Sequence, residues 1–242
     1  MVIKVNENTS FGALNAEIRN SRDREITVDG CVGQRYIATG LSDKRIVING
    51  TPGNALGAYL DGGEVVVHGN AQDATGDTMN GGSIVIYGNA GDATGYAMRG
   101  GKIYVGGNTG YRAGIHMKAY GEYKPVLVIG GRAGSFLGEY QAGGVIVVLG
   151  MHRDGLPIVH NFCGTGMHGG VMYLRCAELP HRLPKQVRAE RVFGAEIAEL
   201  RPIIEDYCAR FDGLDAEKLV RSDYFVLTPD KENPYKQMYT NN

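Results

Sequence analysis

The sequence lacks tryptophan, long apolar runs, paired cysteines and an excess of charge of either sign, and these absences exclude several classes of protein. Its 25 basic and 26 acidic residues are intermixed and leave a net charge of -1, so the basic patch typical of nucleic-acid or anionic-membrane binding is missing. No apolar run approaches the roughly 20 residues of a membrane-spanning helix. Residues 1–10 also lack the apolar core of a signal peptide. We therefore expect a cytoplasmic protein that binds neither nucleic acid nor membranes.

Cysteine and proline are both scarce. Cys31, Cys163, Cys176 and Cys208 form no CxxC pair, so the usual spacing of a zinc ribbon or an iron–sulfur cluster is missing, and we expect reduced thiols. With only 8 prolines, 43% hydrophobic residues and no Gly-X-Y triplet repeat, the chain is neither disordered nor collagen-like.

Glycine is the residue in excess, at 37 of 242 residues, about twice the roughly 7% of an average protein. Many of these glycines recur every 19 residues, which we interpret as structural turn positions. They are Gly50, Gly57, Gly62, Gly63, Gly69, Gly76, Gly81, Gly82, Gly88, Gly95, Gly100, Gly101, Gly107, Gly114, Gly131, Gly138, Gly143, Gly144 and Gly150. The period continues past an insertion near residues 121–125 and a second one near 152–160.

Each repeat contains one short β-branched segment, which predicts one strand. These segments are residues 26–28, 46–48, 65–67, 84–86, 103–105, 126–128, 146–148 and 172–174. No helical pattern long enough for a βαβ crossover separates them, and a propeller blade needs about 40 residues. The repeat therefore predicts an all-β fold, a right-handed parallel β-helix of about eight rungs. Stacked rungs would place residues 60, 79, 98, 117, 141 and 167 in an inward column, and Asn70, Asn89 and Asn108 in an amide ladder.

The ends of the chain predict caps for this solenoid. Phe11, Leu14 and Ile18 have helical spacing after the capping residues Thr9 and Ser10. Apolar residues between Ile197 and Phe211 recur at steps of three and four, which predicts an amphipathic helix. We expect a further helix from residue 215 and an extended segment at 224–227. The predicted division is an N-terminal cap (1–23), the β-helix (24–176) and a C-terminal helical extension (177–242).

Three segments carry a family resemblance: residues 20–24 (NSRDR), residues 50–63 (GTPGNALGAYLDGG) and the repeated G-x-x-G-x-x-x-G turns. Together they resemble the GXGXG β-helix domain at the C-terminus of the glutamate synthase large subunit. The tail segments 196–200 (EIAEL), 215–220 (DAEKLV) and 224–229 (YFVLTP) are similar to the end of that domain. The repeats are also similar to the β-helix found in formylmethanofuran dehydrogenase, for which so long a helical tail is not expected.

The resemblance implies a noncatalytic structural subunit that braces partner chains. Those partners would be an amidotransferase and a synthase that carries FMN and an iron–sulfur cluster, so no cofactor is expected on this chain. Met1 is followed by Val2 and not by the N-terminal cysteine of an amidotransferase. Two other complexes with a similar β-helix subunit stay open as alternatives: a formylmethanofuran dehydrogenase-like complex and an N-methylglutamate synthase complex. Self-association of the chain is a further expectation. A carbohydrate-active β-helix enzyme is disfavoured because tryptophan is absent and the strands carry few acids.

No catalytic or cofactor-binding residue is predicted. Residues 164–169 (GTGMHG) match G-x-G-x-x-G, but they precede a strand and open no helix, so we interpret them as a turn. Residues 130–135 (GGRAGS) lack the Lys-Ser/Thr of a phosphate loop. The second insertion brings His152, His160, Cys163 and His168 into one stretch, which allows a metal site, a partner contact or a plain loop. Tyr111 and the first insertion (120–125) predict an aromatic bump.

Overall fold

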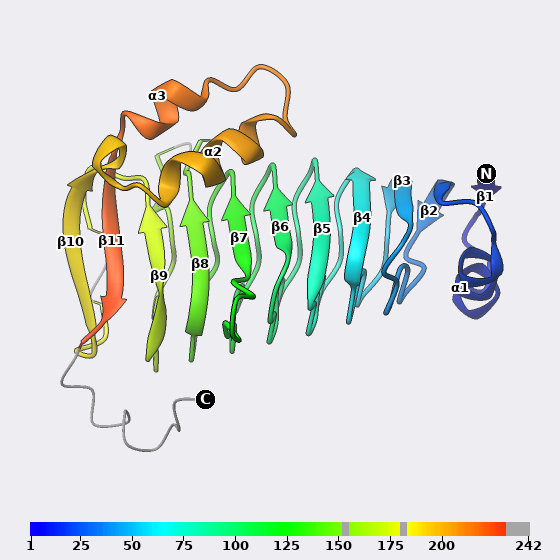
Figure 1. Ribbon diagram of the computed structural model, residues 1–242, viewed down its shortest axis with the longest axis horizontal. Helices are drawn as coiled ribbons and strands as arrows, with labels where there is room; N and C mark the ends of the chain where they lie inside the picture. The colour runs from blue at the N-terminus through cyan, green and yellow to red at the C-terminus, as the bar shows by residue number, and fades with distance from the viewer. Residues whose placement is uncertain (152–154, 180–182, 231–242) are drawn as a thin grey trace.

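The computed structural model describes residues 1–151, 155–179 and 183–230, and β structure dominates them. Eleven strands form a single, mostly parallel sheet in the order β1-β2-β3-β4-β5-β6-β7-β8-β9-β11-β10 (Figure 1). The strands are β1 (Val2–Lys4), β2 (Glu25–Val32), β3 (Arg45–Thr51), β4 (Asp61–His68), β5 (Gly81–Ile86), β6 (Lys102–Val105), β7 (Val126–Ile129), β8 (Ala142–Val148), β9 (Gly169–Leu174), β10 (Val187–Phe193) and β11 (Asp223–Pro229). The helices are α1 (Phe11–Asn20), α2 (Leu200–Cys208) and α3 (Ala216–Val220), with a short 3-10 helix at Gly194–Glu196.

All eight strands predicted from the repeat are present, as the centres of β2 to β9. Each of them pairs in parallel with the next, and residues one repeat apart are in register, as for Ile46 with Val65 and Val65 with Ile84. The 19-residue period therefore measures the distance along the chain from one strand to its neighbour.

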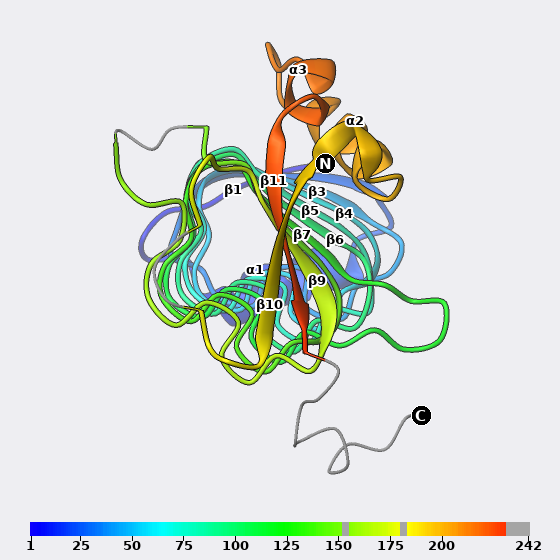
Figure 2. The same cartoon turned by 90° about the vertical axis from the view of Figure 1, so that its left-hand side faces the viewer.

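The segments that connect the strands also stack on one another. Isolated parallel bridges join Ala71 to Ala90, Ala90 to Thr109, Thr109 to Ala133 and Ala133 to Val159. Viewed from the β10 end, successive turns of the chain superimpose around a common interior (Figure 2). The inward column predicted from the repeat is buried in that interior: Leu60, Met79, Met98, Met117, Gln141 and Met167.

Asparagine side chains connect the turns, although not in the way that the sequence suggested. The side-chain oxygen of Asn70 accepts a hydrogen bond from the backbone N–H of Asn89 at 2.8 Å, and Asn89 accepts one from Asn108 at 2.7 Å. The ladder thus runs from side chain to backbone rather than from amide to amide. A second ladder, of aspartates, runs beside it: Asp73 accepts from Asp92, and Asp92 accepts from Tyr111.

On one side of the stack, every second residue of a turn has positive φ. In the turn between β5 and β6, Ala93, Gly95 and Ala97 have φ values of 54°, 72° and 50°. The outer two donate backbone hydrogen bonds to the following turn, Ala93 to Tyr111 and Ala97 to Ile115, and Gly95 donates to Thr75 of the preceding turn. The three positive-φ positions recur from the turn of Tyr36 to the turn of Phe162, and the full set of hydrogen bonds recurs in the turns between those two.

The predicted turn glycines divide into two groups by conformation. Positive φ occurs at Gly50, Gly57, Gly62, Gly63, Gly69, Gly76, Gly82, Gly95, Gly101, Gly114, Gly138, Gly144 and Gly150. Most of the others lie where a side chain would collide with a neighbouring turn: an added Cβ would overlap the side-chain oxygen of an asparagine at Gly88, Gly107 and Gly131, and backbone atoms at Gly100 and Gly143. Gly81 alone among the predicted positions has neither feature, because its φ is ordinary and an added Cβ would find its nearest neighbour at 3.4 Å.

At the N-terminus, α1 closes one end of the stack. Ser10 is its N-cap, with the side chain accepting from Ala13, and Leu14 and Ile18 are buried as predicted. Phe11, the third residue of the predicted apolar face, is instead 48% exposed, with its ring 5.9 Å from that of Tyr36. Before this helix, β1 adds an unpredicted parallel strand beside β2.

At the C-terminus, the prediction of a helical extension was incomplete. Helices α2 and α3 are present, and Asp215 caps α3. The predicted extended segment at 224–227 lies within β11, which pairs antiparallel with β9, and the unpredicted β10 pairs antiparallel with β11. The open edge of β9 provides the reason, because its backbone groups need partners. Helix α2 lies along the outer face of the sheet, where Leu200, Ile204 and Tyr207 are buried over β6 to β9.

Across the described ranges, every helix is too short or too polar to cross a membrane.

Candidate interaction surfaces

Among the described residues of the histidine-rich insertion, His160, Cys163 and His168 do not form a group that could hold a metal ion. His160 is exposed, whereas Cys163 is buried and its sulfur lies 3.9 Å from that of Met172. Burial, with a smaller contribution from Cys176, raises the pKa of Cys163 to about 12, which favours an inert thiol. His168 Nδ1 lies 3.0 Å from the carbonyl oxygen of Gly166. His152 lies outside the described residues, and no group of three potential metal ligands occurs within them.

Both nucleotide-motif look-alikes lie in turns of the stack. Gly164 and Gly166 have positive φ of 72° and 70°, and Gly169 begins β9. At Gly131, in the other segment, the side-chain oxygen of Asn108 occupies the space next to Cα. Both segments serve to stack one turn on the next.

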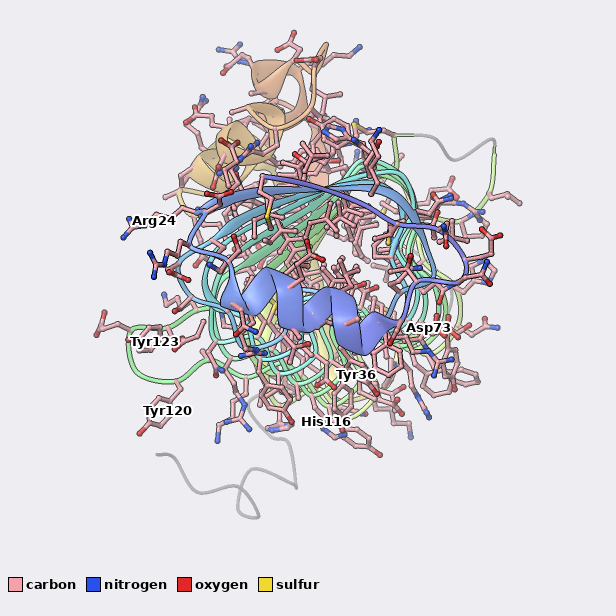
Figure 3. All side chains as sticks on the ribbon, turned by 90° about the vertical axis from the view of Figure 1, so that its right-hand side faces the viewer. Arg24, Tyr36, Asp73, His116, Tyr120 and Tyr123 are labelled. Carbon is pink, nitrogen blue, oxygen red and sulfur yellow. The ribbon has the colours of Figure 1, made fainter. Side chains whose placement is uncertain are left out.

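A row of rings, exposed apart from the half-buried Phe136, follows the positive-φ side of the stack. We define the aromatic face as Tyr96, Tyr111, His116, Phe136, Tyr140 and Phe162. The rings of Tyr111 and Phe136 are 5.2 Å apart, and those of Phe136 and Phe162 are 4.7 Å apart. His116 stacks on Tyr140 at 5.2 Å with an interplanar angle of 11°. Seen from the α1 end, His116 lies on the side of the coil opposite α2 and α3 (Figure 3).

Arg112 is held in place within the aromatic face. Its guanidinium lies 4.8 Å from the ring centroid of Tyr111 and 5.5 Å from that of Phe136. The same group forms an ion pair at 2.7 Å with Glu139, whose side chain is only 8% exposed. Stacked tyrosine, phenylalanine and a fixed arginine are the residue types that dominate binding energy in protein interfaces.

The first insertion forms a separate feature. Tyr120 and Tyr123 exchange two backbone hydrogen bonds of 3.0 Å, which closes a tight hairpin. The predicted bump therefore excludes Tyr111, which packs on Phe136 instead. Tyr120 and Tyr123 lie away from His116 (Figure 3). With Asp61, Asn80 and Arg99 they line an open pocket of about 310 Å³.

A line of alternating charges attaches α2 to the sheet. Arg45 pairs with Glu25 at 2.5 Å and with Glu64 at 2.8 Å. Arg210, just after α2, pairs with Glu64. Asp206 of the same helix pairs with Lys102 at 2.5 Å. Glu25, Arg45, Glu64 and Lys102 occupy the same register position in β2, β3, β4 and β6, so the charge line is visible in the sequence once the repeat is aligned.

Those contacts change the pKa values of the acids. Partial burial raises the pKa of Asp206, but hydrogen bonds from Lys102 and Tyr104 outweigh it, so its pKa lies below the ordinary value. The same balance applies to Glu64. Partial burial raises its pKa, but the hydrogen bonds from Arg45 and Arg210 outweigh this effect and hold the pKa below the ordinary value. Both acids are therefore ionised at neutral pH and hold the tail in place.

Sequence reasoning missed the aromatic face as a unit. Its rings come from different positions of the repeat, and two of its turns follow the first insertion. Aligning the positive-φ positions would have placed Arg112, Phe136 and Phe162 in one column and His116 and Tyr140 in another. The signal existed, but it required knowing which repeat positions face outward.

Comparison with known proteins agrees with this architecture. The GXGXG motif family model matches residues 2–227, from β1 to β11. An uncharacterized protein of Methanocaldococcus jannaschii is 41% identical over 224 residues, which is 90% of this chain and 86% of that protein. The chain therefore belongs to the GXGXG motif family, the family of the C-terminal domain of the glutamate synthase large subunit.

Proposed function

We propose that this chain is a noncatalytic structural subunit of a multisubunit glutamate synthase-type oxidoreductase. The observation that carries the proposal is the family match, which extends over the whole stack and its tail. In this proposal the chain braces an amidotransferase and a synthase, and the latter supplies FMN and the iron–sulfur cluster. The proposal includes the finer fold, a right-handed parallel β-helix of about eight rungs.

The construction of the stack suits a bracing role. Backbone hydrogen bonds and the asparagine and aspartate ladders join each turn to the next on more than one side. A rod built in this way resists bending because every turn is bonded to both neighbours. It would hold two partner chains at a fixed separation.

The aromatic face is the surface that we assign to a partner chain. Its rings are already stacked, and Arg112 is fixed by Glu139, so little side-chain entropy remains to be lost on binding. The charged tail, by contrast, is occupied by contacts to its own sheet.

The test is purification of the tagged chain from its native cell under gentle conditions. Glutamate synthase-type amidotransferase and flavin-containing synthase chains should copurify, and the chain alone should show neither flavin absorbance nor glutamate formation from glutamine. Glutamate formation by the isolated polypeptide would contradict the proposal. Copurification of formylmethanofuran dehydrogenase or N-methylglutamate synthase chains would assign it to one of those complexes instead.

A further inference from the structure

Strand β10 leaves one edge of the sheet open. It pairs with β11, and no strand within residues 1–151, 155–179 and 183–230 pairs with its other edge. Only Val187, its first residue, is buried. Figures 1 and 2 show β10 at the outer end of the sheet, beyond β11. The N–H of Val187 donates to Pro184 at 3.0 Å, so this edge is open beyond Val187. An unpaired strand edge is a template for pairing with another chain.

The hydrogen bonds at the two ends of β10 show which of its backbone groups point outward. Asp230 N–H donates to Gln186 at 2.7 Å, and Gly194 N–H donates to Ser222 at 2.8 Å. In an antiparallel ladder every second residue bonds the same neighbour. The even-numbered residues from Gln186 to Gly194 therefore bond β11, and the backbone groups of Ala189 and Arg191 face away from the sheet.

We propose that two copies of this chain associate through β10, which forms one continuous antiparallel sheet around a twofold axis at Ala189. An axis perpendicular to the sheet pairs residues at equal distances on either side of it. In this register Arg188 lies opposite Glu190 of the second copy, and the reverse pair forms as well. Ala189 exchanges two backbone hydrogen bonds with its own counterpart.

The charged side chains of β10 favour this pairing register over registers whose twofold axis lies at another residue of the strand. An axis at Arg188 or Arg191 would put two arginines face to face, and an axis at Glu190 would oppose two carboxylates. Like charges directly opposite each other in a sheet are destabilising, whereas opposite charges contribute favourably. Arg188 is already oriented by Asp230 at 2.8 Å, and Glu190 forms no ion pair within the described part of the chain. The association leaves the aromatic face uncovered and does not depend on the proposed function.

The experiment is sedimentation velocity of the purified full chain from low to several hundred micromolar. Wild type should form a dimer in this range. Ala189→Pro removes an N–H that β11 does not use, so the fold should persist while the dimer weakens about tenfold or more through two lost hydrogen bonds. Ala189→Ser keeps the N–H and is the matched control, which should dimerise like wild type. Circular dichroism and the melting temperature of the monomer verify that each variant folds.

The charged pair gives a second, independent readout. Glu190→Arg should weaken the dimer, and the swap R188E/E190R should restore it, because the opposite charges again face each other. A wild-type chain that stays monomeric throughout the concentration range would overturn the proposal. So would a dimer whose affinity is unchanged in folded Ala189→Pro, or a swap variant no better than Glu190→Arg.

Discussion

Several residues other than glycine adopt the left-handed conformation in this protein, among them Ala93, Arg112 and Phe136. For an L-residue this conformation costs roughly 1–2 kcal/mol. The cost is offset because the conformation turns each N–H toward an acceptor on the adjacent turn, as Arg112 does to Ser135 at 2.9 Å. The strain therefore belongs to the stacking arrangement.

Ala93→Gly should therefore be nearly neutral or slightly stabilising. Glycine removes the left-handed strain, and its greater freedom in the unfolded chain costs about 0.5–1 kcal/mol, so the two effects nearly cancel. Ala90 lies three residues earlier and has no positive φ, so Ala90→Gly should lower the free energy of unfolding by about 1 kcal/mol or more. Urea unfolding of both variants measures the difference. Equal losses at the two positions would show that the left-handed conformation carries no strain.

Gly82 tests crowding as well as conformation. Its φ is 81°, and an added Cβ would lie 2.5 Å from the carbonyl oxygen of Gly62. Gly82→Val should therefore destabilise the protein by well over the roughly 1 kcal/mol of an average substitution. Gly40→Val is the control, because Gly40 also has positive φ but nothing within 4 Å of an added Cβ. We expect a clearly larger drop in melting temperature for Gly82→Val; an unchanged value would contradict the repeat alignment.

At the scale of elements, the tail is fixed to the sheet by apolar packing and by the charge line. Tyr207 is buried and donates a hydrogen bond to the backbone of Val105 at 3.1 Å. Asp206 beside it accepts from Lys102 and from Tyr104. Burial, and to a lesser degree Asp206, raises the pKa of Tyr104 well above its ordinary value, so Tyr104 stays a donor at neutral pH.

Acid should loosen this attachment. The pKa of Asp206 is lowered in the folded protein, so its stabilising contribution is present above the pKa of a free aspartate and is lost as pH falls through the lower, folded value. We expect unfolding free energy to decline below roughly pH 4. Asp206→Asn should cost about 1–2 kcal/mol at neutral pH and flatten that decline. Glu205→Gln, whose carboxylate faces Arg201 in the same helix, is the control and should change little.

The elements differ in how far the sequence predicted them, for identifiable reasons. Strands β2 to β9 were predictable because β-branched residues recur in phase with glycine. The sequence of β10 (VRAERVF) carries charges on both faces and has no repeat partner, so nothing marked it as a strand. Pro202 did not prevent the predicted helix, because it lies in the first turn of α2, where N–H groups have no intrahelical acceptor.

The interaction surfaces were harder to predict than the fold. The histidine-rich insertion looked chemically dense in sequence, but Cys163 points into the core and His160 does not. Proximity along the chain was a poor guide because the parallel pairing places residues one repeat apart side by side. The aromatic face, whose members are separated by whole repeats, could be recognised only from the stacked turns.

At the scale of the whole molecule, the coil has two unlike sides. One side is covered by α2 and α3, which bury the outer face of the later strands. His116 of the aromatic face lies on the opposite side (Figure 3), and its ring contacts those of Tyr96 and Tyr140. The proposed bracing role requires free surface for partner chains, and the rings of the aromatic face, apart from the half-buried Phe136, are exposed. A partner should therefore contact that face and avoid the tail.

Tyr140→Ser should weaken copurification of that partner, because Tyr140 stacks on His116 within the aromatic face. Tyr59→Ser is a matched control: both tyrosines occupy the same repeat position with positive φ, at 53° and 56°, and both are exposed, but Tyr59 lies outside the aromatic face. The two substitutions should affect folding alike, so a difference in partner recovery reports the surface alone. Truncating a hot-spot aromatic side chain in an interface costs about 2 kcal/mol or more, which lowers affinity at least about 30-fold. Equal recovery with both variants would remove the aromatic face from the proposed assembly.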